Sequence, residues 1–313
     1  MATKEIEAKN EISVDETVKS GRPFRDTWYV CWRELKHFIR SRALVLTTLI
    51  TPFIWLLFMG NTFNFSNAGS ELASVLAAKL LAIPGMTPGI LQGIGQAFQG
   101  FSLTQFIFGA SSYLTFFTPG IIALTTIMGG IMGGNTIVWD RRLGFLNKML
   151  AAPISRTSIA TGKIISSSLR TGMQATIISL VAVLVLGVQV ATGPLGFVLA
   201  ILIAMFLCLG FASLSMAIAA TLKNMDAMFA IMSLLSFPLL FMSPAMFPLK
   251  LFPQWLQDLA SFNPVTYGVQ PIRALFINDW PTFFGLLPDL GVIAVFSIAM
   301  IAIATILFRR SVS

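Results

Sequence analysis

Charged side chains are scarce in this 313-residue chain. Only 11% of its residues are Asp, Glu, Lys or Arg, whereas a soluble globular domain carries about 25%. Hydrophobic residues make up 56% of the chain, and the mean hydropathy is +0.81. This composition excludes an ordinary soluble protein and predicts an all-α membrane protein with several spans.

Cysteine and histidine are nearly absent as well. Cys31 precedes the first long apolar run and Cys208 lies inside a later one, so we expect no disulfide framework. His37 is the only histidine, and it has no second His or Cys at ligand spacing. We therefore expect no metal site, no catalytic residue and no cofactor bound by this chain.

The sequence also lacks the elements that power transport. The apolar runs hold no carboxylate at mid-depth that could relay protons, and Asp289 lies near the outer end of the last run. Gly162 and Lys163 are followed by Ile164 instead of Ser or Thr. Thr157 stands where a phosphate-binding loop needs its first glycine. If the protein moves a substrate uphill, the energy must come from a partner.

Six apolar runs are candidates for membrane helices, because a bilayer core about 30 Å thick needs roughly 20 apolar residues per helix. They cover residues 43–60, 114–138, 171–190, 195–222, 227–243 and 283–308. With a cytoplasmic N-terminus, 18 of the 21 basic residues lie inside, and only Lys79, Lys250 and Arg273 lie outside. We therefore expect both termini in the cytoplasm. The net charge of +8 follows from this orientation and gives no reason to expect nucleic acid as a partner.

The segments between the spans have different expected roles. Residues 1–26 are polar and predict a disordered cytoplasmic tail. Residues 27–42 predict an amphipathic helix at the inner membrane surface, and residues 61–113 predict an outer loop. Residues 244–282 are too short and too rich in proline to cross the membrane twice, so they predict a re-entrant outer hairpin; a plain interfacial turn is the alternative. Residues 27–313 thus form one transmembrane domain.

Span two contains four glycines, at positions 129, 130, 133 and 134. They make two overlapping pairs in which small residues stand four apart. Such pairs let helices approach closely. They predict tight packing, either within the chain or against a second copy.

A short basic segment, VWDRRLGFLNKMLAAPISR, follows span two. It predicts a cytoplasmic helix over residues 139–153 that ends before Pro153, which cannot extend it. Leu146 and Met149 share an apolar face, with Phe145 beside it. Three basic residues supply its charged edges: Arg141, Arg142 and Lys148. This face predicts a docking contact with a partner protein, and a helix lying flat among lipid headgroups is the alternative.

Two segments resemble the signatures of type-2 ABC transporter permeases, and the most similar type is the daunorubicin-resistance multidrug export permease. The first is WDRRLGFLNKMLAAPISRTSIATGK, with matching positions at Asp140, Arg141, Gly144, Phe145, Leu146, Ala152 and Pro153. The second is FMSPAMFPLKLFPQWLQDLASFNPVTYGVQPIR, with matching positions at Pro253, Trp255, Asn263, Pro264 and Arg273. The outer segment over residues 61–113 is longer than usual in this family.

The resemblance implies a mechanism and partners. Two permease subunits, a second copy or a paralogue, form the pathway, and separate ATPase subunits bind ATP and Mg. The implied ATPase-coupling residues are Asp140, Arg141, Arg142, Gly144, Phe145, Leu146, Lys148, Met149 and Pro153. The implied setting is the inner membrane of a prokaryote, with contacts to its lipids.

The expected cargo is a hydrophobic or amphipathic drug or lipid, because the spans are rich in Phe and carry almost no charge. Export of a polysaccharide or glycolipid is an alternative, since aromatic residues also stack on sugars. The other alternative function is that of a membrane scaffold with the same fold that transports nothing. A neighbouring or co-purifying ATPase would separate a transporter from a scaffold.

The basic-residue asymmetry generates a topology test. Cysteines introduced at Asn147 and Asn224 should be shielded from an impermeant thiol reagent in intact cells, and cysteines at Asn67 and Gln257 should be labelled. Permeabilised cells serve as the control, because all four sites should then react. Labelling at Asn147 from outside would overturn the predicted orientation.

Overall fold

The chain folds into a bundle of helices. The computed structural model describes residues 23–62, 75, 79, 103–222, 224–277 and 283–312, and all regular structure in these ranges is helical. The helices are α2 (Pro23–Arg40), α3 (Arg42–Thr62), α6 (Leu103–Phe108), α7 (Tyr113–Arg142), α8 (Phe145–Ala151), α9 (Arg156–Leu184), α10 (Gly193–Thr221), α11 (Met225–Phe241), the 3-10 helix η1 (Leu249–Leu251), α12 (Gln254–Phe262), α13 (Pro264–Ile277) and α14 (Phe283–Val312). Most of the predicted tail and outer loop lies outside the described residues.

Five helices are long and apolar enough to cross a membrane: α3, α7, α9, α10 and α14. They correspond to all the predicted spans except the fifth. The chain is therefore an all-helical, multi-pass membrane protein, as its composition predicted. The fifth predicted span, residues 227–243, coincides with α11, which is apolar but shorter than the other five. A sixth crossing through α11 stays a prediction.

The third predicted span differs most from the structure. The apolar run over residues 171–190 covers only the second half of α9, which begins well before that run and ends before it does. The Ser155 side chain caps the first turn by accepting a hydrogen bond from the Ser158 backbone N–H at 3.1 Å. The first half of α9 carries Lys163 and Arg170, whose charges mark the end of an apolar run in sequence. Both side chains are buried inside the bundle, so the helix continues through them.

Two other predicted boundaries also change. The amphipathic helix predicted over residues 27–42 begins at Pro23, because proline is well suited to the first turn of a helix, and it ends before Ser41. The helix predicted over residues 139–153 is two pieces. Its first residues continue α7, and only α8 forms a separate helix.

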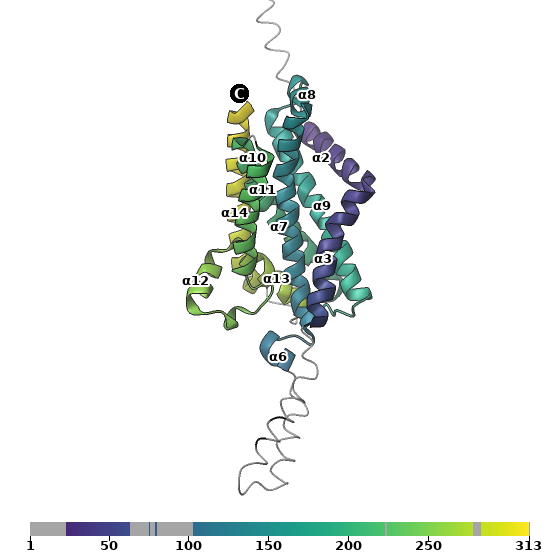
Figure 1. Cartoon of the computed structure of the whole chain (residues 1–313), viewed down its shortest axis with the longest axis vertical. Helices are drawn as coiled ribbons and strands as arrows, with labels where there is room; N and C mark the ends of the chain where they lie inside the picture. The colour runs from purple at the N-terminus through teal and green to yellow at the C-terminus, as the bar shows by residue number, and fades with distance from the viewer. Residues whose placement is uncertain are drawn as a thin grey trace, which may run out of the picture.

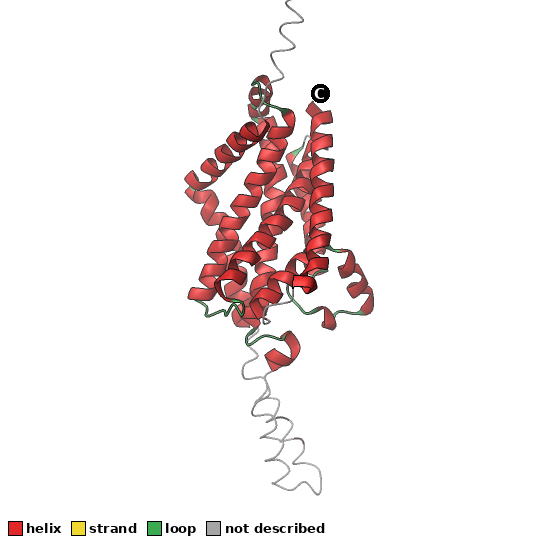
Figure 2. Cartoon of the chain, turned by 180° about the vertical axis from the view of Figure 1, so that it is seen from behind, coloured by secondary structure: helices red, strands yellow, loops and turns green. Residues whose placement is uncertain are grey.

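The long helices run roughly side by side, and α7 lies in the middle of the bundle (Figure 1). α8 and the C-terminal end of α14 lie at one end of the bundle, while α6, α12 and α13 lie at the other. α2 slants across the α8 end, as the view from behind also shows (Figure 2). The main apolar core follows α7, α9, α10 and α13, with Phe117, Ile122, Leu207 and Ile272 fully enclosed.

The glycines of α7 allow the closest helix contacts. A Cβ on Gly130 would lie 2.5 Å from Phe211 Cβ of α10, and a Cβ on Gly133 would lie 2.7 Å from Ser167 Oγ of α9. Ser215 of α10 donates a hydrogen bond to the Ile131 carbonyl oxygen at 2.8 Å. Packing within the chain, one of the two predicted uses of these glycines, is therefore what the structure shows.

This packing predicts different effects of alanine at two helical glycines. Gly130→Ala should destabilise the protein by about 1–3 kcal/mol, because the added methyl group overlaps α10. Gly291→Ala in α14 is the matched control. No atom lies within 4 Å of its added methyl group, and alanine favours a helix by roughly 0.5–1 kcal/mol. Thermal unfolding of the purified protein should show the difference, and equal midpoints would contradict it.

Candidate functional site

Four charged side chains meet where α2 packs against α7 and α9. Lys163 of α9 is fully buried, and its Nζ lies 2.6 Å from Asp140 Oδ2 and 3.0 Å from Glu34 Oε1. Nζ also donates a hydrogen bond to Thr136 Oγ1 at 3.3 Å. Arg33 pairs with Glu34 at 2.5 Å and lies 3.7 Å from Asp140. We call Arg33, Glu34, Asp140 and Lys163 the ion network, and its two cations and two anions balance.

Glu34 is held in its ionised form. Burial by itself would raise the pKa of this carboxyl group, but the charges and hydrogen bonds of Lys163 and Arg33 offset that effect and lower the pKa from 4.5 to about 2. Because the pKa is lower in the folded state, the carboxylate contributes stability above about pH 4.5. That contribution is lost as the pH falls toward 2. Glu34 therefore stabilises the α2 contact throughout the physiological range.

An elbow joins α7 to α8. Gly144 has a φ of +70°, a left-handed conformation that glycine adopts without steric cost, and its N–H donates to the Arg141 carbonyl oxygen at 3.2 Å. The Arg141 side chain donates from Nη1 to the Leu222 carbonyl oxygen at 3.0 Å, which closes the end of α10. Gly144 and Arg141, both singled out from the sequence, therefore shape this end of the bundle.

The residues of the short basic helix that were predicted to be apolar contacts are partly buried and partly exposed. Leu146 is only 2% exposed, and Met149 is also buried, because both pack into a core with Ile159 and Ile164. Leu146 is therefore not available to a partner, contrary to the prediction that it docks beside Phe145. Phe145 itself is 41% exposed. The exposed residues from 142 to 153, which we call the α8 surface, are Arg142, Leu143, Phe145, Asn147, Lys148, Ala151 and Pro153.

Arg33 connects the ion network to the α8 surface. Its guanidinium lies 4.7 Å from the Phe145 ring centroid, and its Nη1 donates a hydrogen bond to Met149 Sδ at 3.2 Å. Trp28 and Trp32 of α2 are exposed, and their rings stack with centroids 6.3 Å apart. α2 and α8 thus form one connected surface at this end of the bundle.

Asn263 and Arg273, both singled out from the sequence, anchor α13. Asn263 Oδ1 accepts a hydrogen bond from the Val265 N–H at 3.0 Å and caps α13, which begins at Pro264. Its Nδ2 donates to the Leu239 carbonyl oxygen at 2.7 Å and so attaches α13 to α11. α13 therefore has a fixed place at the end of the bundle opposite α8 (Figure 1).

Arg273 and Trp255 differ in their surroundings. The Arg273 guanidinium lies 3.7 Å from the Phe116 ring centroid, and its Nη2 donates to the Pro244 carbonyl oxygen at 2.6 Å. It thereby attaches α13 to α7. Trp255 is 63% exposed on α12, just after Pro253, and α12 projects beside the bundle (Figure 1).

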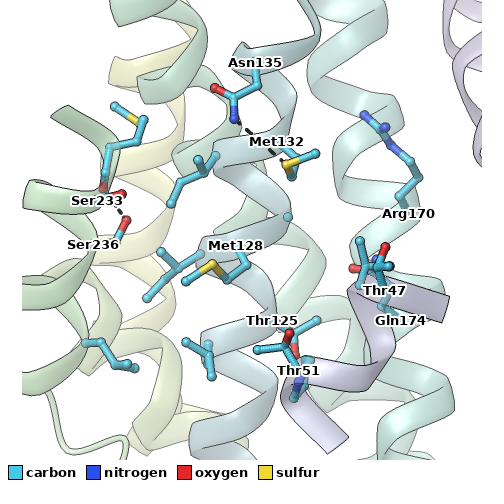
Figure 3. Close-up of a pocket in the computed structure, with 18 of the residues that line it drawn as sticks. Thr47, Thr51, Thr125, Met128, Met132, Asn135, Arg170, Gln174, Ser233 and Ser236 are labelled. Carbon is cyan, nitrogen blue, oxygen red and sulfur yellow. Dashed lines mark hydrogen bonds between the residues drawn. The ribbon is translucent and has the colours of Figure 1, made fainter. Parts of the chain in front are cut away.

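A groove of about 460 Å³ follows α7, with α11 on one side and α3 and α9 on the other (Figure 3). Its lining is mostly apolar and includes Trp55, Leu124, Met128, Phe229, Phe237 and Leu240. Ser233 and Ser236 lie on the α11 side, and Arg170 and Gln174 lie on the α9 side. In the described part of the chain, no group of three or more His, Cys, Asp or Glu side chains is placed to hold a metal ion. The groove is therefore a largely apolar cavity with a few polar side chains.

Six hydroxyl side chains line the groove: Thr47, Thr48, Thr51, Thr125, Ser233 and Ser236. Four of them donate to a backbone carbonyl of their own helix; the donors are Thr47, Thr48, Thr125 and Ser236. These four hydroxyl hydrogens are not available to a ligand. The walls are therefore less polar than their residue types indicate.

The most polar groups of both regions were missed by the sequence analysis. Lys163 was considered only as part of a failed phosphate-binding loop, and Glu34 was not considered. Arg170 was counted among the cytoplasmic charges that set the orientation, yet it lines the groove. No local pattern could have found them, because their partners lie on other helices.

The ion network predicts a large effect of one substitution. Lys163→Met should destabilise the protein by about 3–5 kcal/mol, because Glu34 and Asp140 would remain buried without their shared cation. Thermal unfolding in detergent measures the effect. The exposed Lys148 provides the control, and Lys148→Met should change stability by less than about 0.5 kcal/mol. Combining Lys163→Met with Glu34→Gln and Asp140→Asn should recover most of the loss, and no recovery would contradict the ion network.

The sequence is similar to several known transport proteins. It is 34% identical to ycf38 of Cyanophora paradoxa over 170 residues, and this aligned stretch makes up 54% of the present chain and 58% of that protein. The chain thus spans little more than half of this relative's length. It is 26% identical to nodulation protein J of Rhizobium leguminosarum bv. viciae over 201 residues, 64% of this chain and 75% of that protein. It is 23% identical to the daunorubicin resistance ABC transporter permease protein DrrB1 of Streptomyces coeruleorubidus over 188 residues, 59% of this chain and 66% of that protein. The model of the ABC-2 type transporter family matches residues 25–277, and the chain belongs to that family.

Proposed function

We propose that this protein is the permease subunit of an ABC exporter and that the groove along α7 takes a hydrophobic or amphipathic drug or lipid. The groove itself is the observation that carries this proposal. It has about 460 Å³ of space and a mostly apolar lining, and it lies between three helices that are long enough to span a membrane, α3, α7 and α9, and the shorter apolar helix α11. An apolar cavity with a few polar groups is the usual form of a small-molecule site.

The hydroxyl groups of the groove favour an apolar cargo over a sugar. A polysaccharide or the sugar of a glycolipid would need many free donors and acceptors along the walls. Four of the six groove hydroxyls donate to their own helices instead. A glycolipid remains the second candidate cargo, because its lipid part would fit the apolar lining of the groove.

A separate ATPase chain supplies the energy in this proposal. DrrB1 is named as the permease protein of an ABC transporter, and the present chain has no phosphate-binding loop in its sequence. The α8 surface offers an exposed aromatic ring with basic residues at its edge, and Arg33 connects it to the ion network. Movement of a docked ATPase would thus reach α2, α7 and α9 together. ATP and Mg would bind to that partner.

A second permease copy, or a paralogue, would cover the open side of the groove. α3 exposes Leu46, Ile50 and Phe58, and α11 exposes Leu234 and Phe237, all of them large and apolar. Facing copies would bury these residues and enclose the substrate. Lipid would cover those that remain outside.

The proposed setting is the inner membrane of a prokaryote, with α11 as a sixth crossing and both termini in the cytoplasm. The α8 end of the bundle then faces the ATPase. α12 and α13 form the re-entrant hairpin at the outer end, where Trp255 and Leu259 lie in the outer leaflet or over the exit.

The docking proposal predicts that Phe145→Ala releases the ATPase or uncouples ATP hydrolysis from transport. A central aromatic anchor usually contributes about 2 kcal/mol or more to an interface. Arg142→Ala should do much less, since exposed charges contribute about 0–1 kcal/mol each, and its effect should shrink in high salt. Co-purification of the ATPase and substrate-stimulated hydrolysis are the measurements.

The alternative in which α8 lies flat on the membrane predicts the reverse order. Basic residues would then hold it to anionic headgroups at about 1 kcal/mol apiece, so Arg142→Ala would be the more harmful change. Leu146→Ala is not a test of docking, because its side chain is in the core and its loss would weaken the fold. Normal coupling in Phe145→Ala would rule out the docking proposal.

A further inference from the structure

One charged side chain, Arg170, lines the groove along α7, and it lies at one end. Asn135 and Arg170 line the end that lies toward α8, whereas Thr51 and Thr125 lie at the opposite end (Figure 3). The lining between the two ends is mainly apolar, with Met and Phe side chains from α7 and α11, and it also includes Gln174 and several hydroxyl groups. A ligand that matches this distribution has one polar end and an apolar body.

Arg170 is a buried cation that the protein compensates incompletely. Its residue is only 9% exposed, and its guanidinium donates to the Ser166 carbonyl oxygen at 3.3 Å and to Ser167 Oγ at 3.1 Å. Its Cζ lies 5.9 Å from the Phe38 ring centroid. Within the described ranges, no carboxylate lies within 4 Å of it, and Nη1 has no hydrogen-bond partner. Its direct contacts are therefore all neutral, and the negative charge that acts on it comes from Glu34 at longer range.

The nearby acids are already in use. Glu34 and Asp140 form the ion network with Lys163 and Arg33, and that set is balanced by itself. Arg170 thus adds one positive charge to a largely apolar groove. A charge in such surroundings is costly unless an opposite charge accompanies it, and an ionisable residue inside a membrane bundle indicates a functional site.

Asn135 gives a second, independent observation at the same end. Its residue is buried at 1% exposed, and its Oδ1 has no hydrogen-bond partner among the described residues. The only contact of its Nδ2 is a long one of 3.9 Å to Met132 Sδ. Buried amide groups normally have partners, so this group awaits a ligand or a water molecule.

We propose that the groove binds an amphiphile with an anionic headgroup, its phosphate-like group on Arg170 and Asn135 and its apolar tail along Met128, Phe229 and Phe237. The headgroup supplies the negative charge that Arg170 lacks and, when it carries a hydroxyl group, a donor for Asn135. This inference rests on the proposed function, and it narrows the cargo from any amphipathic molecule to an anionic one.

The test compares three probes that share one fluorescent dodecyl tail and differ only in the head: a phosphate monoester, an alcohol and a trimethylammonium group. Binding is measured on the full chain in nanodiscs of phosphatidylcholine, with empty nanodiscs subtracted. The wild type should bind the phosphate probe at least tenfold more tightly than the alcohol probe. Arg170→Gln should remove this preference, and Arg170→Lys should keep most of it. Lys36→Gln, which removes an exposed cation of α2, should change nothing.

Several results would overturn the inference. The inference is wrong if the wild type binds all three probes equally well, or if Arg170→Gln keeps the preference for the phosphate probe. Arg170 would then have only a structural role, through its contacts with Ser167 and Phe38. Displacement of the phosphate probe by millimolar inorganic phosphate would mean that the site takes the free anion instead of an amphiphile. If Arg170→Gln does not fold, Asn135→Leu takes its place. This variant should lose the preference of the wild type for the phosphate probe, and keeping the preference would contradict the inference.

The outcome is separate from that of the proposed function, because binding is measured without the ATPase. Loss of ATP-driven transport in the reconstituted complex, with headgroup selectivity intact, would refute the exporter and not the site. Transport of the phosphate and alcohol probes at equal rates, with equal binding, would refute the site and not the exporter.

Discussion

One buried ammonium group holds together the end of the bundle where α2, α7 and α9 meet beside α8. Lys163 of α9 has no exposed surface, and two carboxylates from two other helices neutralise it. An uncompensated charge there would cost several kcal/mol, so α2, α7 and α9 must stay in contact for the fold to persist. Arg33 extends this contact from the Glu34 carboxylate to the Phe145 ring, so the α8 surface is connected to α2.

Four of the five long helices could be predicted from the sequence because membrane helices are encoded locally. A run of about 20 apolar residues specifies a span regardless of its neighbours, so α3, α7, α10 and α14 fall close to their predicted positions. The same rule failed for α9, where Lys163 and Arg170 interrupt the apolar run although the helix continues. Their burial depends on partners far away in sequence, which no local window contains.

The functional residues divide in the same way. Gly144, Phe145 and Asn263 could be found from their sequence neighbourhood, because an elbow, an exposed ring after it and a helix cap are local features. Leu146 was misplaced, because a seven-residue helix has too few turns to reveal which face meets the core. Asn135 and Arg170 could not be found at all, since a groove exists only once α3, α7 and α11 are assembled.

The groove hydroxyl groups that donate to their own helices have an evolutionary consequence. Thr47, Thr48 and Thr125 each donate to the backbone of their own helix, so none of them holds two helices together. Exchanging such a threonine for valine, or the reverse, changes the local polarity while keeping nearly the same shape. If the groove binds the proposed cargo, single substitutions of this kind would change which molecules it accepts without a loss of folding. A broad and shifting substrate preference would then be the expected history of such a wall.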